Sequence, residues 1–471
     1  MSYKLVNKPA RGLFRAYDIR GVVGSGFDAD VFYTLGVVLA ARVRLGGKSV
    51  VAIGRDGRLS SPELAAALIV GCQDGGCDVV DVGVVPSPVL YFAAHTLSVD
   101  AGFMVTGSHN PKQYNGLKMV IEGRTLSEAD IQEIYQQIVA GNLALPGGGS
   151  YQEHSIISAY ISDIKQRLHV ARPLKVVVDC GNGVAANTAP ELYRALGCEV
   201  VPLHATVDGN FPNHHPNPSV AENMQDLIAA VQAEQADIGL AFDGDADRLG
   251  VVTGEGKIIW PDRLMMLYSQ DVLERHPGAK VVFDVKCSSF LADVIAKYGG
   301  VPMLWRTGHS VLKAKMIEEN AALAGEMSGH IFFSENWYGF DDGVYAGARL
   351  LEILAARTHS LAHIFDHFPE GVNTPEILLP VADEKKFALM ERLIAIAHFP
   401  DASVSTLDGL RVTFSHGWGL VRASNTTPNL TLRFESTSEA GLEAIRAQIS
   451  EALLACDSSL DVSALEVYTT S

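Results

Sequence analysis

The sequence has few cysteines, no long apolar run and a shortage of positive charge, and each of these features excludes a class of protein. The six cysteines form no C-x-x-C pair, so neither a zinc ribbon nor a dithiol redox site is expected. No stretch of about 18 apolar residues occurs and the N-terminus carries no apolar secretion signal, so we expect a cytoplasmic protein. With 37 Lys and Arg against 54 Asp and Glu, the net charge of −17 would repel nucleic acid and anionic lipid, and we expect neither as a partner.

Glycine and apolar residues are abundant, and their order is typical of an α/β protein. A chain of 471 residues is too long for one hydrophobic core, since cores stop growing near ~250–300 residues. A strand, helix, strand rhythm occurs three times, at residues 48–83, 174–203 and 280–305, as in repeated domains. Apolar strands such as V-V-V-D-C favour sheets that are buried on both faces and mainly parallel.

The last hundred residues lack this rhythm. Helical patterns at 388–397 and 438–454 accompany strand patterns at 409–414 and 430–434, which is an α+β arrangement. We therefore predict four domains. Their predicted limits are residues 1–152, 153–256, 257–369 and 370–471, the first three with a similar mixed or mainly parallel α/β core and the fourth smaller and α+β.

The strongest single motif is Asp243-Gly-Asp245-Ala-Asp247-Arg248, directly after an apolar strand at 238–242. Carboxylates at i, i+2 and i+4 can converge in a loop broken by glycine, and clustered anions need a cation to offset their repulsion. Hard oxygen ligands favour Mg²⁺ or Ca²⁺ over zinc. The alternative is a solvated acidic turn. An EF-hand is excluded because Arg248 stands where its glycine belongs.

A second motif, Thr106-Gly-Ser108-His-Asn110-Pro, follows the apolar run at 102–105. A serine held in a tight turn at a strand end can act as a nucleophile. The alternative is an ordinary Ser/Thr turn or a helix cap. The motif is not a nucleophile elbow, because Asn110 replaces the second glycine of G-x-S-x-G.

Two further loops carry polar side chains suited to a phosphorylated sugar. The loop Gly325-Glu-Met-Ser-Gly-His330 offers groups that bond to polyol hydroxyls, although loops of this composition are often only turns. The loop Arg422-Ala-Ser-Asn-Thr-Thr-Pro-Asn429 offers donors suited to a phosphate, or forms a polar hairpin. A G-x-G-x-x-A pattern at 181–186 resembles a dinucleotide fingerprint, but the acidic residue that should close the next strand is misplaced.

Together, T-G-S-H-N-P, D-G-D-A-D-R, G-E-M-S-G-H and R-A-S-N-T-T-P resemble, in this order and over essentially the whole chain, the α-D-phosphohexomutase superfamily and its bacterial phosphomannomutase/phosphoglucomutase branch. The resemblance implies four domains around a central cleft. It also implies that Ser108 carries a phosphoryl group in the resting enzyme and that Asp243, Asp245 and Asp247 hold Mg²⁺ against it.

The resemblance assigns roles to other residues as well. The further catalytic positions it implies are Lys118, His309, Arg20 and Arg248. The substrate-binding positions it implies are Tyr17, Lys286, Glu326, Ser328, His330, Arg422, Ser424, Asn425 and Thr426. Which of Lys118 and His309 is the acid and which the base stays open, because proton affinity depends on geometry.

The activity implied is an isomerase that interconverts hexose 1-phosphates and hexose 6-phosphates of mannose and glucose, with a hexose 1,6-bisphosphate as intermediate and activator. We expect a monomer whose partner is a small phosphosugar. The alternatives are a phosphoglucosamine mutase, a metal-dependent sugar phosphatase and a sugar-phosphate sensor. The preference between mannose and glucose is left open by the sequence.

Overall fold

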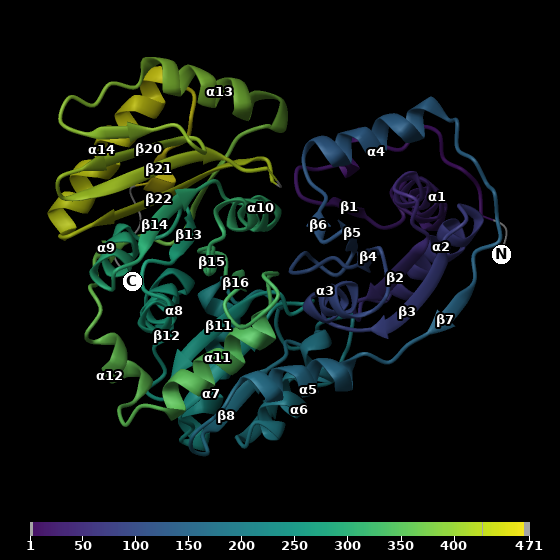
Figure 1. Cartoon of the computed structure of the whole chain (residues 1–471). Helices are drawn as coiled ribbons and strands as arrows, with labels where there is room; N and C mark the ends of the chain where they lie inside the picture. Colours follow the sequence, from purple (N-terminus) through teal and green to yellow (C-terminus); the bar gives the residue numbers. More distant parts are fainter. Residues whose placement is uncertain (1–2, 426, 466–471) are drawn as a thin grey trace.

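The computed structural model describes residues 3–425 and 427–465, and its strands form four sheets that follow one another around the molecule (Figure 1). We number the domains by the sheet that each contains. In the first sheet the strand order is β1-β5-β4-β2-β3-β7, with β6 paired to β5. Its strands are β1 (Ile19–Val22), β2 (Val50–Arg55), β3 (Asp78–Val84), β4 (Ala101–Val105), β5 (Tyr114–Ile121), β6 (Arg124–Thr125) and β7 (Tyr151–Glu153).

Helices cover both faces of the first sheet, which explains its continuous apolar strands. The helices of this domain are α1 (Ala29–Leu45), α2 (Ser61–Asp74), α3 (Ser87–Thr96) and α4 (Ala129–Ala140). Val51 and Ile53 of β2 belong to the core that contains α1 and α2. Ala52, between them, belongs to the core that contains α3. Successive side chains of a strand point to opposite faces, so both sets are apolar.

The second and third domains repeat part of this arrangement. The second contains β8 (Lys175–Asp179), β9 (Glu199–Leu203), β10 (Ile238–Phe242), β11 (Leu249–Thr253) and β12 (Ile258–Ile259), with α5 (Ile157–Arg167), α6 (Ala189–Ala195) and α7 (Gln225–Glu234). The third contains β13 (Lys280–Asp284), β14 (Val301–Trp305), β15 (Leu323–Gly325) and β16 (Ile331–Phe333), with α8 (Pro261–Arg275), α9 (Ser289–Lys297), α10 (His309–Glu319), α11 (Gly343–Ala355) and α12 (Leu361–Phe365).

One four-strand unit is common to the three sheets. Its first strand (β2, β8 or β13) pairs in parallel with the second (β3, β9 or β14) and with the third (β4, β10 or β15). The third strand then pairs antiparallel with the fourth (β5, β11 or β16). The predicted threefold repeat of mixed, mainly parallel α/β cores is confirmed. The domain limits stay predictions.

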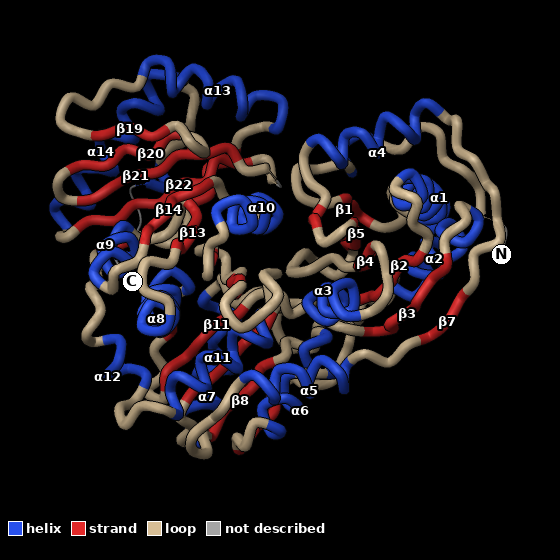
Figure 2. The backbone as a smooth tube through the Cα atoms, viewed as in Figure 1, coloured by secondary structure: helices blue, strands red, loops and turns tan. Residues whose placement is uncertain are grey.

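The fourth domain has an entirely antiparallel sheet. Its elements are β17 (Val372–Asn373), β18 (Ile377–Pro380), β19 (Ser403–Ser405), β20 (Leu410–Phe414), β21 (Gly417–Ala423), β22 (Asn429–Ser436), α13 (Asp383–Ile396) and α14 (Glu439–Cys456). Val421 of β21 packs in a core with both helices, whereas Leu420 packs with Val285 of the third domain. Figure 2 shows this sheet beside the strands of the third domain.

Two sequence features discussed above, the cysteines and the lack of a long apolar run, can be compared with the structure. All six cysteines lie in the described ranges and are free thiols. Within those same ranges, the helices are too short or too polar to cross a bilayer.

The close contact between α1 and α2 depends on glycine, and this leads to a stability prediction. A Cβ at Gly71 would lie 2.1 Å from the carbonyl oxygen of Tyr33. Helix propensity alone favours Gly→Ala by about 1 kcal/mol. We expect Gly71→Ala to destabilise instead, by about 1–3 kcal/mol, because the helices must separate. Denaturant unfolding measures the change.

The matched control is Ala66→Gly, at an exposed position of the same helix. It should cost about 1 kcal/mol through propensity alone. A Gly71→Ala variant that is more stable than the parent protein would contradict the close packing of the two helices.

Candidate active site at the meeting of four domains

Ser108 lies in a constrained turn at the end of β4. Its backbone has a positive φ of 49°, which is uncommon for a residue other than glycine. Its N–H donates to Thr106 Oγ1 at 2.8 Å, and its carbonyl accepts from Arg58 Nη2 at 2.7 Å. A Cβ at Gly107 would lie 2.4 Å from Arg58 Nε, so only glycine fits there. The turn therefore fixes the direction of the Ser108 hydroxyl.

The three carboxylates of the D-G-D-A-D-R motif converge after β10. Asp243, Asp245 and Asp247 are fully buried, and one oxygen of each lies within 4.8 Å of the others. The Ser108 hydroxyl donates to Asp243 Oδ2 at 3.1 Å. The structure thus brings the predicted nucleophile of the first domain onto the predicted metal loop of the second.

Lys118 of β5 supplies positive charge to this cluster. Its ammonium donates to Asp245 Oδ2 at 2.6 Å and also contacts Asp247. Burial alone would lower the pKa of Lys118, but these two carboxylates raise it well above its usual value. Burial also raises the pKa of Asp243 well above its usual value, and repulsion from Asp247 and Asp245 adds to the shift. The cluster therefore holds more negative charge than Lys118 offsets.

The donor set fits a hard divalent cation. Asp245 Oδ1 and Asp247 Oδ1 are buried and have no hydrogen-bond partner within the described residues. An orphaned carboxylate oxygen in a buried site is costly unless a cation binds it. Three carboxylates with no nitrogen or sulfur donor match the preference of Mg²⁺.

Two imidazoles lie beside the acidic cluster. Arg248 Nε donates to His330 Nε2 at 3.0 Å, and His330 Nδ1 lies 3.0 Å from Asp341 Oδ2. His309 stacks on His330, with ring centroids 5.3 Å apart. Burial, reinforced by the nearby Lys313, lowers the pKa of His309 well below its usual value. A neutral His309 can accept a proton.

Tyr17 contacts the predicted distal loop and the turn that precedes α10 in the third domain. The Tyr17 hydroxyl donates to the Thr307 carbonyl at 2.8 Å and accepts from Asn425 Nδ2 at 2.6 Å. Its ring lies 6.3 Å from that of His309. Glu326 Oε2 accepts from Ser328 Oγ at 2.6 Å. Tyr17 therefore connects the first, third and fourth domains.

The remaining predicted cations are already paired with acids. Arg422 Nε donates to Asp408 Oδ2 at 3.2 Å, Lys286 Nζ donates to Glu376 Oε1 at 2.5 Å, and Arg20 pairs with Asp18. Ser424 Oγ accepts from the N–H of Thr427 at 3.1 Å. The predicted residue Thr426 lies outside the described residues.

Several residues of the site were missed by sequence reasoning. Arg58 holds the Ser108 carbonyl, Asp341 faces both imidazoles, and Asp408 holds Arg422. His109 Nδ1 lies 3.2 Å from Ser108 Oγ. A signal existed for Arg58, because R-D-G-R follows an apolar strand as the other motifs do. Asp408 stands in an ordinary turn, and its sequence neighbours gave no signal.

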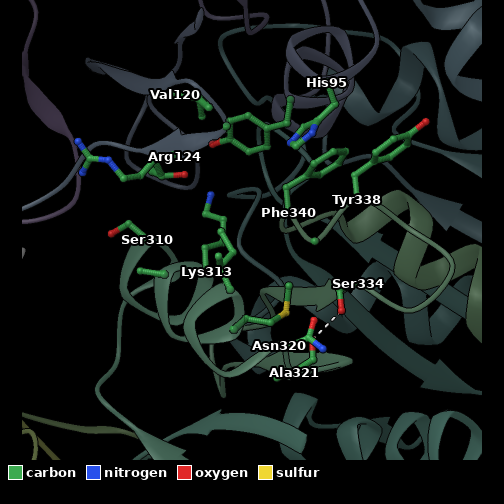
Figure 3. Close-up of a pocket in the computed structure, with 17 residues that line it drawn as sticks. His95, Val120, Arg124, Ser310, Lys313, Asn320, Ala321, Ser334, Tyr338 and Phe340 are labelled. Carbon is green, nitrogen blue, oxygen red and sulfur yellow. Dashed lines mark hydrogen bonds between the residues drawn. The ribbon is translucent and has the colours of Figure 1, made fainter. Parts of the chain in front are cut away.

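A cavity of about 250 Å³ lies between the first and third domains and is separate from this cluster. His95, Arg124, Lys313 and Tyr338 are among its lining residues. Figure 3 shows Lys313 reaching from α10 toward the wall that carries Val120 and His95. None of the predicted site residues is among its described lining residues.

Four family models match the chain in order. They are the phosphoglucomutase/phosphomannomutase alpha/beta/alpha domains I (residues 11–144), II (158–256) and III (260–371) and the C-terminal domain (376–452). A phosphomannomutase/phosphoglucomutase of Pseudomonas aeruginosa PAO1 is 54% identical over 450 residues, 96% of this chain and 97% of the relative. A phosphoglucomutase of Neisseria gonorrhoeae is 49% identical over 439 residues, 93% of this chain and 95% of the relative. The solved structure of a phosphoglucomutase/phosphomannomutase family protein from Burkholderia thailandensis superimposes with a TM-score of 0.92 at 49% identity, covering 96% of this chain and 99% of that one.

The charge imbalance around Lys118 generates a prediction. In Lys118→Met the buried carboxylates lose their ammonium partner, so the folded protein should depend more strongly on a divalent cation. Adding EDTA should lower the unfolding temperature of Lys118→Met more than that of the parent protein. We expect an extra shift of at least ~4 °C, which corresponds to about 1 kcal/mol in a domain near 100 residues.

The control is Lys313→Met, which removes a buried ammonium paired with Asp341 at 2.9 Å outside the three-carboxylate cluster. Equal EDTA shifts in the two variants would show that Lys118 does not offset the charge of that cluster.

Proposed function

The chain belongs to the phosphoglucomutase/phosphomannomutase family, and on that premise we propose that it interconverts hexose 1-phosphates and hexose 6-phosphates of mannose and glucose through a phosphoserine at Ser108. The observation that carries this proposal is the hydrogen bond from the Ser108 hydroxyl to Asp243 in a buried acidic cluster. Because relatives at 49–54% identity are named phosphoglucomutase or phosphomannomutase/phosphoglucomutase, the phosphoglucosamine mutase alternative is not favoured.

The reaction proposed is a pair of phosphoryl transfers. In the first, the bond between phosphorus and Ser108 Oγ breaks while phosphorus bonds to a free sugar hydroxyl, whose proton leaves to a base. The Ser108 oxygen takes a proton from an acid, so the product is a hexose 1,6-bisphosphate and an unmodified serine. In the second, the other phosphate returns to Ser108 Oγ, the serine gives up its proton, and the freed sugar oxygen takes one. No water or other co-reactant is consumed.

Asp243, Asp245 and Asp247 are proposed to hold Mg²⁺, which would neutralise negative charge on the phosphoryl oxygens during transfer. The turn holds the Ser108 hydroxyl in a fixed direction, and positioning of this kind supplies much of the catalysis in phosphoryl transfer. Arg20 and Arg248 are proposed to add guanidinium donors suited to phosphoryl oxygens.

Lys118 and His309 are suited to the two proton transfers. Asp245 and Asp247 raise the proton affinity of Lys118, so neutralising these carboxylates makes Lys118 a stronger acid. His309 has a pKa well below its usual value and is neutral at pH 7, so it can act as the base. We propose that Lys118 donates and His309 accepts in one transfer, with the roles reversed in the other.

The sugar must present either end to Ser108, so its other contacts must tolerate two orientations. Glu326, Ser328 and His330 are proposed to bind ring hydroxyls. The phosphate that is not transferred is proposed to bind to Tyr17, Lys286, Arg422, Ser424, Asn425 and Thr426. The acids that now pair with Lys286 and Arg422 would compete with that phosphate, which limits its affinity and favours its release.

The central prediction concerns Ser108. The variant Ser108→Ala should lose mutase turnover by several orders of magnitude, because no other hydroxyl replaces the nucleophile. Turnover is assayed with glucose 1-phosphate and mannose 1-phosphate, with added hexose bisphosphate. Intact mass spectrometry of the parent protein should show an excess of one phosphate on Ser108.

The matched control is Ser60→Ala, since Ser60 lies in the same domain and bonds to Asn115 rather than to the acidic cluster. It should keep its turnover and its phosphate. Full turnover in Ser108→Ala would refute the assignment of the nucleophile.

Removal of the metal gives a second test. EDTA should abolish turnover and added Mg²⁺ should restore it, because the buried carboxylates then lack their cation. Asp245→Asn should need a higher Mg²⁺ concentration for half-maximal turnover. Undiminished activity in EDTA would remove the basis for a metal in this loop.

A further inference from the structure

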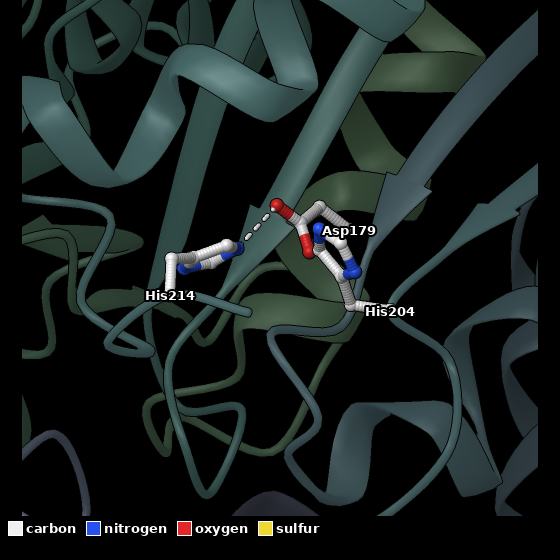
Figure 4. Close-up of side chains that lie close together, drawn as sticks. All are labelled: Asp179, His204 and His214. Carbon is white, nitrogen blue, oxygen red and sulfur yellow. Dashed lines mark hydrogen bonds and ion pairs between the residues drawn. The ribbon is translucent and has the colours of Figure 1, made fainter. Parts of the chain in front are cut away.

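A second cluster of candidate ligands lies in the second domain, outside the active-site motifs. Asp179 ends β8, His204 follows β9 directly, and His214 lies in the loop beyond (Figure 4). One ligand atom of each residue lies within 4.8 Å of the others. The cluster combines one carboxylate with two imidazoles, so its chemistry differs from that of the all-carboxylate loop.

The contacts of His214 place an acceptor nitrogen of its ring opposite an acceptor oxygen of Asp179. Its Nδ1 lies 3.0 Å from the carbonyl oxygen of His215, which can only accept, so the proton is on Nδ1. In the neutral ring Nε2 then carries a lone pair, and it points at Asp179 Oδ2 from 2.8 Å. Two acceptors at this distance require a cation at that place, either an extra proton or a metal ion.

Each of the three side chains is also held by a second partner. Asp179 Oδ1 accepts from the N–H of Gly181 at 2.9 Å, and His204 Nε2 lies 3.0 Å from Asp226 Oδ2. His214 has the carbonyl of His215. Metal ligands in proteins typically have such partners, which fix the orientation and tautomer of the ligand.

The repeated unit shows that Asp179 is used differently from its counterparts. An aspartate stands at the end of the first strand in all three units, as Asp56, Asp179 and Asp284. Asp56 accepts from the N–H of Gly107 at 3.0 Å, and Asp284 accepts from that of Met327 at 3.1 Å. These two therefore hold the motif loop after the third strand, whereas Asp179 faces His214.

We propose that Asp179, His204 and His214 form a binding site for one transition-metal ion, with Zn²⁺ as the ion that this ligand set favours. Imidazole nitrogens suit Zn²⁺, whereas Mg²⁺ takes oxygen ligands. Bond lengths of about 2.0–2.2 Å in a tetrahedral site place ligand atoms ~3.4 Å apart. The three ligand atoms already lie within 4.8 Å of one another, so small side-chain movements are enough to reach this geometry. Both imidazoles are partly exposed, which leaves a route for the ion and a fourth position for water.

The ion would fasten a segment that contacts the Ser108 turn. Between His204 and His214 lies Phe211, whose ring is 5.2 Å from the guanidinium of Arg58. Arg58 in turn holds the carbonyl of Ser108. The role assigned to the metal is therefore structural, stabilising the contact between the first and second domains.

The test is a calorimetric titration of the full-length protein with Zn²⁺ in excess Mg²⁺, which keeps the acidic cluster occupied. We expect one Zn²⁺ per chain and a higher unfolding temperature when it binds. Co²⁺, used as a probe, should give the visible absorption of a four- or five-coordinate site. In His204→Asn and His214→Asn the affinity for Zn²⁺ should fall by more than ~10-fold. Mutation of a residue that merely orients a metal ligand already costs at least that much, and these two residues are the proposed ligands themselves.

Asparagine is the suitable replacement at position 204, because the φ of 46° there is one that Asn tolerates. The matched control is His363→Asn in the exposed row of His359, His363 and His367, whose successive ring centroids lie 4.4 and 5.0 Å apart. This variant should keep the full affinity. Its turnover with Mg²⁺ alone, like that of His204→Asn, should equal that of the parent protein.

Three results would overturn the proposal. One is the absence of Zn²⁺ binding in excess Mg²⁺, which would leave a protonated His214 paired with Asp179. Another is binding that survives in His204→Asn but is lost in His363→Asn, which would place the ion on the exposed histidines. The third is loss of binding in Asp243→Asn alone, which would place it in the acidic cluster. Should His214→Asn fail to fold, His204→Asn decides between these outcomes.

Discussion

The contact of Lys118 with Asp245 and Asp247, two of the three buried aspartates, is the interaction on which the rest of the structure depends. Carboxylates that are withdrawn from water must be neutralised, and here an ammonium from the first domain partly neutralises acids of the second. The charge balance of the site and the docking of the two domains are therefore one interaction. Because Lys118 offsets only part of the charge, the same contact that joins the domains also leaves a demand for a cation beside Ser108.

The repeated four-strand unit explains why three separate motifs meet. Ser108, Asp243 and Glu326 all stand after the third strand of their units, β4, β10 and β15. Ligands in α/β sheets bind outside the carboxyl ends of the strands. Three copies of one unit, arranged in succession, thus supply the proposed nucleophile, the acidic cluster and the proposed sugar loop from the same position. The fourth domain contributes its loop from a different fold, so its place could not be deduced from the repeat.

The sequence predicted strands and loops well where apolar runs end in glycine or aspartate, as at β8 and β10. It did not predict the fourth strand of each unit, because β16 has only three residues and neither β5 nor β11 shows a regular alternation of apolar and polar residues. Lys118 lies on such a strand, β5, and only family resemblance pointed to it. Asp341 contacts His309 and His330, and Asp408 contacts Arg422. These partners lie outside the local motifs, so no local sequence pattern records them.

The four domains are joined by contacts of very different strength. The first and second are joined by buried charges. The third and fourth are joined by Arg433, which is buried against Asp262 at 3.0 Å, and by Glu435, which accepts from Ser289 at 2.7 Å. The first and fourth meet where Asn425 donates a hydrogen bond to the Tyr17 hydroxyl. A partly buried hydrogen bond of this kind contributes about 1 kcal/mol, whereas breaking a buried ion pair costs several, so the contact between Asn425 and Tyr17 is weaker than the buried charge contacts of the other domains.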